Sequence, residues 1–316
     1  MADFYFLQAN PEIAQMMNSD LSLGRICYYK DMKNYINQAV PTLYNQNDIN
    51  YNTYSFEIEN FMKVLLCMIV NNRLSYTLHY EGLSCSEKDI HNVIENVKSA
   101  FIIMQSKFIE YFSGIHGVEV QSQMKLMGRK VISCDLNISF EEIYNNALND
   151  TFKFLGLCSV VKNELLRHGK IYRGMSQKDI ARVLYNWVCL HINYDESFNP
   201  MSFTGYGSMI NGIGVCQGIT AMYNALCKLF GISIVGMSGI GKGKNSPKGE
   251  KHIWSYGILD GNYCYIDTTW GKPVFMNSNT LRQYGVEPTC LCNFEYFCIP
   301  HNKFIHEHSW DRKIYG

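Results

Sequence analysis

The amino-acid sequence predicts an α+β fold for the second half of the chain. Between residues 216 and 230 apolar side chains recur at helical spacing, and Gly231 is a typical helix stop. Short strand patterns follow at residues 232–237, 252–259 and 263–267. Because the helix precedes the strands instead of alternating with them, we expect an antiparallel sheet with this helix packed on it.

The elements around this helix have predictable ends. Ser176 and Asp179 indicate the N-terminus of an earlier helix, which is expected to end near Asn193. Residues 260–262 (Asp-Gly-Asn) separate the last two strand patterns and have the composition of a tight hairpin turn. This turn would make the two strands antiparallel neighbours.

The first half of the chain predicts an α/β region. Residues 74–80 alternate as a half-buried strand does, and Ser86 with Asp89 predicts a capped helix after it. Residues 131–138 predict another strand, and residues 139–142 (Ser-x-x-Glu) predict the cap of a second helix. Such strand–cap–helix units fit either a duplicated motif or an ordinary α/β scaffold.

A basic, glycine-containing stretch at residues 167–174 lies between two periodic segments. We interpret it as a linker between two domains. The expected domains are an N-terminal α/β region of unknown role at 1–170 and a second domain at 171–316.

Charge and composition limit the classes of partner. Lys and Arg together number 28, as do Asp and Glu, so the formal net charge is zero. This balance gives no electrostatic reason to expect nucleic acid or an anionic membrane as a partner. The longest apolar run, residues 61–70, is much shorter than the ~20 residues that cross a bilayer. We therefore expect neither nucleic-acid nor membrane binding.

The placement of the cysteines indicates a reducing compartment. Four of the 12 cysteines lie within apolar helical patterns, where a free thiol behaves as a small hydrophobic side chain: Cys67, Cys158, Cys189 and Cys227. The first residues lack the basic segment and long apolar run of a secretory signal. We expect a cytoplasmic location, and a disulfide-bonded state is the alternative.

Cys216 is the candidate nucleophile. The predicted helix begins at this residue, and the positive end of the helix dipole with its free N–H groups favours a thiolate there. The same N–H groups can bind the oxyanion that forms when a carbonyl is attacked. Gly212, Gly214 and Gly218 leave room for a substrate carbonyl to reach the sulfur.

His252 and Asp267 are the candidate base and its orienting group. His252 begins one predicted strand and Asp267 ends the next, so the hairpin would place their side chains side by side. The carboxylate would fix the tautomer of the imidazole while the other ring nitrogen faces the thiol of Cys216. The three side chains together predict a nucleophile, a base and an orienting group.

These residues lie in three runs that resemble the signature blocks of the transglutaminase-like superfamily. The runs are 214–218 (Gly-Val-Cys-Gln-Gly), 252–254 (His-Ile-Trp) and 265–270 (Tyr-Ile-Asp-Thr-Thr-Trp). Their order and spacing are also those of the family, and the similarity covers about residues 175–310. One departure concerns the substrate rim, because Gly-Lys-Pro follows Trp270 where the family often has an acidic residue.

Shorter similarities lie outside the three blocks. Residues 193–195 (Asn-Tyr-Asp) resemble the lead-in element of the family, and Tyr206 stands where related proteins often carry an aromatic residue. The pair Tyr296 and Phe297 and the region of His308 are similar to a segment that follows the domain in bacterial members.

The resemblance implies a papain-like α+β transglutaminase core, with the cysteine on a helix packed on the antiparallel sheet that carries the histidine and aspartate. It implies that Cys216, His252 and Asp267 form a catalytic triad that attacks a protein or peptide carbonyl and forms a thioester. Analogy with bacterial members favours hydrolysis of peptide or amide bonds, as in a cysteine protease, and transamidation of glutamine side chains is the other possible outcome. No cofactor or metal is implied.

Four further side chains are candidates for the substrate groove or the oxyanion site. Trp254 and Trp270 are expected in the core or in the groove wall. Gln217 either helps to line the oxyanion site or faces solvent, and Tyr206 is a candidate groove residue.

Two other classes of function remain open. The main alternative is a non-catalytic peptide- or protein-binding module on the same fold, with an intact but idle triad. An acetyltransferase that uses coenzyme A is less favoured, because residues 236–243 approach a phosphate loop but have Gly243 where Ser or Thr must bind magnesium. We interpret this stretch as part of a basic loop before His252, with lysines at positions 242, 244, 248 and 251.

A zinc site near the C-terminus is not favoured. The side chains concerned are Cys290, Cys292, Cys298 and His301. Their Cys-x-Cys spacing is not the usual spacing of a zinc knuckle. His306 and His308 alternate along an extended segment, where a lone metal-binding pair is also not expected.

Overall fold

The computed structural model describes residues 56, 58–243, 248–272 and 292–311. These residues form two compact units.

The N-terminal unit contains the described residues of Tyr29–Gln105 together with Gly114–Asn149. The C-terminal unit contains Ser106–Ser113 and the described residues from Asp150 onward. The domain division predicted at residue 170 stays a prediction.

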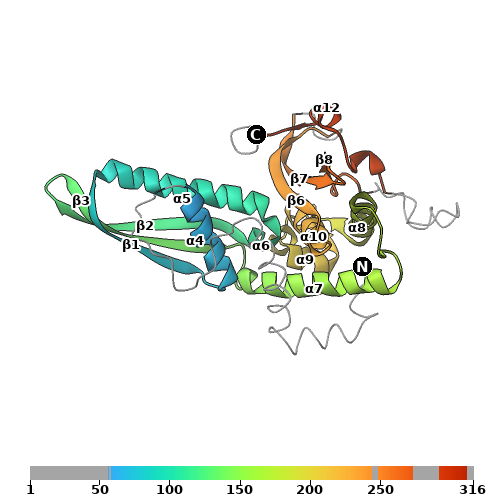
Figure 1. Ribbon diagram of the computed structural model, residues 1–316, viewed down its shortest axis with the longest axis horizontal. Helices are drawn as coiled ribbons and strands as arrows, with labels where there is room; N and C mark the ends of the chain where they lie inside the picture. Colours follow the sequence, from blue (N-terminus) through green and yellow to red (C-terminus); the bar gives the residue numbers. More distant parts are fainter. Residues whose placement is uncertain (1–55, 57, 244–247, 273–291, 312–316) are drawn as a thin grey trace. The chain divides into compact units, whose positions relative to one another are not determined.

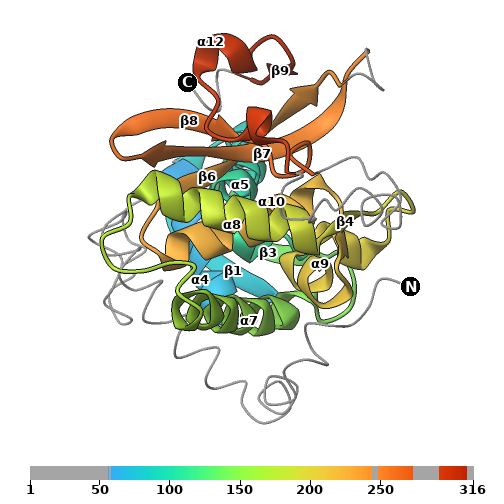
Figure 2. The same ribbon diagram turned by 90° about the vertical axis from the view of Figure 1, so that its right-hand side faces the viewer.

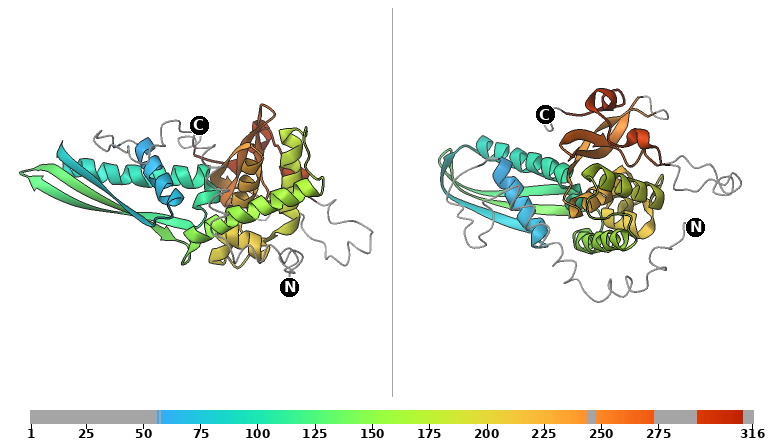
Figure 3. Two further views of the ribbon diagram at one scale, coloured as in Figure 1. Left: turned by 60° about the horizontal axis from the view of Figure 1, so that its bottom comes forward. Right: turned by 45° about the vertical axis from the view of Figure 1, so that its right-hand side comes forward.

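The N-terminal unit is an antiparallel sheet accompanied by two helices (Figure 1). The strand order is β1-β3-β2, and β2 and β3 form the long hairpin drawn in green in Figure 3. The element bounds are α4 Ile58–Val70, β1 Ser75–Cys85, α5 Glu87–Lys107, β2 Ile115–Met127 and β3 Lys130–Glu142. Phe101 of α5 contacts Phe140 of β3, with ring centroids 6.4 Å apart, so the helix packs on the sheet.

The capped helix predicted after the first strand is confirmed. Asp89 Oδ2 accepts hydrogen bonds from the Ser86 backbone N–H and hydroxyl, both at 2.8 Å, and the Asp89 N–H donates to Ser86 Oγ at 3.3 Å. This reciprocal pair satisfies donors that the first helical turn would otherwise leave free. One apolar face of α5 is buried at Ile90, Val93 and Val97.

Two expectations for this unit are wrong. Its strands are all antiparallel, so the described part is α+β rather than α/β. Residues 139–142 are the end of β3 and not a helix cap, because their side chains continue the alternation of the strand. Glu142 nevertheless caps the next helix, α7 (Ala147–Arg167), from outside it, because Glu142 Oε1 accepts from the Leu148 N–H at 2.7 Å.

The C-terminal unit contains an antiparallel sheet of order β8-β7-β6-β9 (Figure 2). Helices α8 and α10 cover one face of this sheet, and α12 lies on the other side. The main bounds are α8 Gln177–His191, α10 Cys216–Leu229, β6 Ser233–Gly241, β7 Glu250–Leu259, β8 Asn262–Ile266, α12 His301–Phe304 and β9 His308–Ser309. Helix first and antiparallel sheet afterwards is the order that the sequence predicts.

Shorter elements complete the unit. Strands β4 and β5 are a two-residue parallel pair, and helix α9 ends at Asn211, just before the glycine-containing segment that leads to Cys216. The bounds are α6 Ile109–Phe112, β4 Asn193–Tyr194, η1 Pro200–Phe203, α9 Gly205–Asn211, β5 Ile213–Gly214 and η3 Phe294–Tyr296.

Helix α10 is the central element of the C-terminal unit. It contacts α6, α8, α9, β6 and β7, and every residue from Gly218 to Cys227 is buried. A helix enclosed on all sides must be apolar all round, which is why it shows little polar face. Both ends are held by the segment 106–113: Gln217 Nε2 donates to Ser113 O at 3.2 Å, and Lys228 forms an ion pair with the buried Glu110.

The hairpin turn predicted at residues 260–262 is confirmed, and it also anchors α8. Asp260 and Gly261 both have positive φ, 49° and 82°, as the tight hairpin turn requires. Asp260 Oδ1 accepts from the Gln177 N–H at 2.9 Å, and Oδ2 accepts from the Lys178 N–H at 3.1 Å. The turn between β7 and β8 therefore caps the first turn of α8 together with Ser176.

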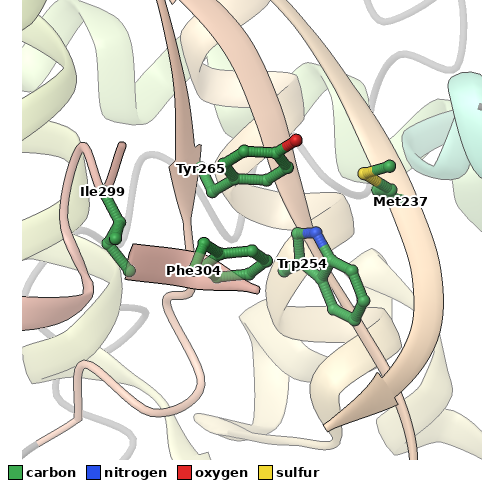
Figure 4. Close-up of a cluster of buried hydrophobic side chains, with 5 residues drawn as sticks. All are labelled: Met237, Trp254, Tyr265, Ile299 and Phe304. Carbon is green, nitrogen blue, oxygen red and sulfur yellow. The ribbon is translucent and has the colours of Figure 1, made fainter. Parts of the chain in front are cut away.

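The second face of the sheet is sealed by an aromatic cluster that contains Met237, Trp254, Tyr265, Ile299 and Phe304 (Figure 4). Tyr265 and Phe304 stack with ring centroids 4.4 Å apart and an interplanar angle of 7°. Phe304 belongs to α12, so burial of these rings attaches the C-terminal segment to the sheet.

The interpretation of residues 236–243 as loop is wrong for most of the stretch. Strand β6 continues to Gly241, and Lys251 already lies in β7. Lys244 lies outside the described residues. The alternating glycines at 239 and 241 are strand positions in β6.

The remaining expectations from composition concern the cysteines and the membrane. The ten described cysteines are free thiols, and Cys158, Cys189 and Cys227 are buried in helices as predicted. Cys67 lies in α4 and is half-buried. Among the described helices, none combines the length and the apolar character of a bilayer span.

The Asp260 cap gives a test of how the hairpin and α8 stabilise each other. Asp260→Gly keeps the positive φ but removes the acceptor, so it should lower the free energy of unfolding by about 1 kcal/mol. Asp260→Ala should cost more than Asp260→Gly, because alanine removes the acceptor and, unlike glycine, keeps a β-carbon in left-handed backbone. Urea unfolding of both variants measures this, with Asp260→Asn as the control that keeps one acceptor. Wild-type stability in Asp260→Gly would contradict the cap.

Candidate active site

Cys216 is the first residue of α10. Val215 precedes the helix as its N-cap in extended conformation and provides no side-chain cap. The first backbone N–H groups of α10 therefore lack a side-chain acceptor and carry the positive end of the helix dipole. Cys216 is only half-buried, whereas the helix becomes fully buried from Gly218 onward, so the sulfur is at the accessible end.

The glycines beside Cys216 are required by close packing. A β-carbon at Gly214 would lie 2.3 Å from Ser208 Oγ, and one at Gly218 would lie 2.1 Å from the same atom. Ser208 is fully buried in α9 and donates to Ser202 O at 3.2 Å. The run Gly-Val-Cys-Gln-Gly thus lets α9 approach the start of α10, which positions Cys216.

His252 and Asp267 are brought together by the β7–β8 hairpin. Ser255 pairs with Ile266, so Asp267 continues past β8 opposite Trp254 and diagonal to His252 on the same face. His252 Nε2 donates to Asp267 Oδ2 at 2.7 Å. His252 is 6% exposed and Asp267 is fully buried, so water does not compete for this hydrogen bond.

The Cys216 thiol lies close enough to the His252 ring to contribute to the raised pKa of His252. Because Asp267 occupies Nε2, the nitrogen left for the sulfur is Nδ1. The structure therefore brings together all three side chains of the predicted triad, on α10, on β7 and just after β8.

The charges in this group stabilise one another. Burial alone would lower the pKa of His252, but the charge of Asp267, its hydrogen bond and the contact with Cys216 raise that pKa to about 10. Burial acts to raise the pKa of Asp267, but attraction to His252 and hydrogen bonds from His252 and His308 hold it below its ordinary value. The imidazole is therefore held protonated beside an ionised carboxylate.

Asp267 has four hydrogen-bond donors. Oδ1 accepts from the backbone N–H groups of Thr269 at 2.9 Å and Trp270 at 3.0 Å. Oδ2 accepts from His252 and, at 3.2 Å, from His308 Nε2. The run Asp-Thr-Thr-Trp thus forms a turn, in which the aspartate side chain accepts hydrogen bonds from the backbone of Thr269 and Trp270.

Aromatic rings enclose the two histidines. Trp270 stacks on His252 with centroids 4.9 Å apart and an interplanar angle of 15°. Trp254 is fully buried and meets His308 edge-on at 4.8 Å. Trp254 thus lies in the core, which is one of the two places predicted for it. Trp270 packs beside the imidazole of His252.

The alternating glycines of β6 make room for these rings. A β-carbon at Gly239 would lie 2.7 Å from Trp254 and 2.1 Å from the Ser309 carbonyl oxygen. A β-carbon at Gly241 would lie 2.9 Å from Trp270. The glycine run that resembles a phosphate loop is therefore mostly strand. Its glycines lack side chains where the tryptophan rings and β9 pack against β6.

The other two predicted groove residues have contacts away from the thiol. Gln217 uses its side-chain amide to hold Ser113 O. The ring of Tyr206 faces α7, with Lys153 Nζ 5.6 Å from its centroid. The roles predicted for both residues at the oxyanion site or groove stay predictions.

Sequence reasoning missed two side chains at this site. Tyr194 is 42% exposed, and burial together with charge interactions with Cys216 and Glu250 raises its pKa to about 12. His308 contacts Asp267 from β9. The available signals were weak: Tyr194 lies in the lead-in element, and the region of His308 resembles a segment that follows the domain in bacterial members.

Metal binding has little support in the described residues. His252, Asp267 and His308 place one ligand atom each within 4.8 Å, but N–H···O hydrogen bonds already join these atoms. We therefore interpret the three as a hydrogen-bonded group. In the zinc candidate near the C-terminus, Cys290 lies outside the described residues, and Cys292 and Cys298 contact Cys189 and Cys264 instead.

Comparison with known proteins agrees with this geometry. Residues 169–268, which contain the whole predicted triad, match the transglutaminase-like superfamily. Kyphoscoliosis peptidase of Mus musculus is 26% identical over 194 residues, which are 58% of this chain and 27% of that protein. Kyphoscoliosis peptidase of Homo sapiens is 25% identical over 143 residues, 42% of this chain and 21% of that protein. The chain thus spans about a quarter of the length of these relatives.

A solved structure described as "a Putative Cysteine Protease from Cytophaga hutchinsonii" is 13% identical, with a TM-score of 0.31 over 51% of this chain and 67% of that chain. A score this low carries no argument. The family match is the more informative comparison: residues 169–268, which contain the helix-borne cysteine and most of the antiparallel sheet, are similar to the transglutaminase-like superfamily.

Proposed function

We propose that the protein transfers acyl groups through a thioester on Cys216, with His252 as base and acid and Asp267 as the group that orients His252. The single observation that carries the proposal is the buried His252–Asp267 hydrogen bond beside a half-buried thiol at a helix N-terminus. Burial makes such a charged group costly unless it is fully paired, as it is here.

In the first step, the sulfur of Cys216 attacks a peptide or amide carbonyl carbon and forms a C–S bond. The carbonyl oxygen becomes an oxyanion, which the free N–H groups at the start of α10 stabilise. His252 then gives its proton to the leaving amine as the C–N bond breaks, and a thioester remains. Asp267 keeps the ring oriented throughout.

In the second step, an acceptor attacks the thioester and His252 takes its proton. Water as the acceptor gives hydrolysis, and a primary amine gives transamidation. We favour hydrolysis of a protein or peptide, because both relatives reported above bear the name peptidase. A thiolate nucleophile must stay reduced, so the proposal includes a reducing location such as the cytoplasm.

Cys216 should react with iodoacetamide faster at pH 6.5 than a free cysteine does, because an adjacent imidazolium and a helix N-terminus favour its thiolate. Mass spectrometry of labelled peptides measures the rate, with half-buried Cys298 as the internal control. His252→Ala should lower the labelling rate of Cys216 by about tenfold or more. Equal rates for Cys216 and Cys298 in the wild type would support the idle binding module instead.

The raised pKa of His252 predicts a pH-dependent stability. The pKa of His252 is ~6.5 in the unfolded chain and about 10 in the folded protein. Its contribution to stability is therefore complete below pH ~6.5 and is lost as the pH rises to about 10. Between these values the wild type should lose up to about 1.4 kcal/mol per pH unit relative to His252→Gln. Urea unfolding at several pH values tests this, and parallel curves for the two proteins would contradict the ion pair.

The acceptor can be identified with one peptide substrate and one fluorescent primary amine. Cleavage without incorporation of the amine is expected for a hydrolase, and Cys216→Ala should abolish it. Incorporation of the amine would show that the second step is transamidation instead of hydrolysis. The proposed thioester step would still hold. Absence of both reactions over a broad peptide library, with an unreactive Cys216, would overturn the enzyme proposal.

A further inference from the structure

His308 contacts the candidate active site from a part of the chain that lies beyond the family match, which ends at residue 268. It is the first residue of β9, and it is 3% exposed. Its backbone pairs with Gly241 of β6, and the Lys242 N–H donates to Glu307 O at 2.7 Å. The main chain therefore fixes where the imidazole lies.

Packing also fixes the plane of the His308 ring. Phe304 stacks on it with centroids 3.8 Å apart and an interplanar angle of 10°. Trp270 lies at 4.5 Å, and Trp254 meets the ring edge-on. A ring enclosed by aromatic side chains on these sides has one polar direction left, toward Asp267.

The hydrogen bonds define the tautomer of His308. Ionised Asp267 only accepts, so the 3.2 Å contact requires a proton on His308 Nε2. Among the described residues, His308 Nδ1 is buried and has no hydrogen-bond partner. A single proton on Nε2 satisfies both conditions.

We propose that His308 is a positioning residue that shares Asp267 Oδ2 with His252 and thereby sets the pH range of the site. The inference rests on the proposed function of Cys216, His252 and Asp267. Because two N–H groups divide the electron density of one carboxylate oxygen, His308 weakens the hold of Asp267 on the His252 proton. A base that releases its proton more readily completes both acyl-transfer steps nearer to neutral pH.

Other titratable groups also lie near Asp267. Cys189, Tyr185, Tyr194 and Tyr296 interact with its charge, and Cys216 faces His252. Only His252 and His308 donate side-chain hydrogen bonds to Asp267 within the described part of the chain. His308 is therefore the side chain whose replacement changes the carboxylate most directly.

The experiment uses full-length protein with ¹⁵N-labelled histidine in a Cys216→Ala background, where the titration belongs to the ring alone. Nitrogen chemical shifts report the tautomer of each of the 9 histidines, and His252→Gln and His308→Gln assign the two of interest. His308 is expected as the Nε2–H tautomer. An Nδ1–H tautomer would overturn the proposal without any variant at position 308.

The second readout is the titration of His252. His308→Leu removes the donor and should shift this titration upward by about one pH unit, the equivalent of tenfold. His308→Gln keeps an N–H donor near the same place and should restore most of the shift. His306→Leu, an exposed neighbour, is the matched control. The proposal is contradicted if His252 titrates as in the wild type in folded His308→Leu. It is also contradicted if His308→Gln shifts the His252 titration as much as His308→Leu does.

Activity of the proteins that retain Cys216 separates this inference from the proposed function. His308→Leu should lower kcat/KM about tenfold, mostly through kcat, and move the activity maximum to higher pH. Wild-type turnover with an unchanged profile in His308→Leu would overturn the role of His308 alone. An unreactive Cys216 in the wild type would overturn the proposed function, whereas the histidine titrations would still test the hydrogen bond.

Discussion

The buried carboxylate of Asp267 is the constraint on which the site depends. A fully buried charge is costly unless each of its acceptor positions is satisfied. Here Thr269 and Trp270 donate to one oxygen, and His252 and His308 donate to the other. These donors come from three places, the turn after Asp267, strand β7 and strand β9, so the fold around the carboxylate cannot shift without leaving a charge unpaired.

The rest of the C-terminal unit brings the donors to this point. The β7–β8 hairpin sets His252 diagonal to Asp267, and its turn also caps α8. The glycines of β6 leave space for the tryptophan rings and for the pairing with β9. On the opposite face of the sheet, α10 carries Cys216 at its accessible end and is held at both ends by residues 106–113. The N-terminus of α10 thus lies near His252, where the thiol contributes to the raised pKa of the imidazole.

Much of this arrangement was predictable from sequence, and the failures have physical causes. Cys216, His252 and Asp267 were found because helix start, strand and turn chemistry are local signals. His308 was missed because only packing of β9 on β6 brings it to Asp267. Residues 236–243 resemble a loop in sequence because a glycine-rich strand lacks apolar alternation when rings from neighbouring residues fill the space. In the N-terminal unit, β2 was missed because most of its side chains are exposed and its apolar pattern is weak.

The most direct test is a crystal structure of the protein after reaction with a peptide aldehyde, which mimics the tetrahedral state of acyl transfer. The account predicts a covalent bond from Cys216 Sγ to the aldehyde carbon, with the new oxygen against the first N–H groups of α10. His252 should lie between this adduct and Asp267 through its two ring nitrogens. An adduct on another thiol, or a His252 ring turned away from Asp267, would contradict the account.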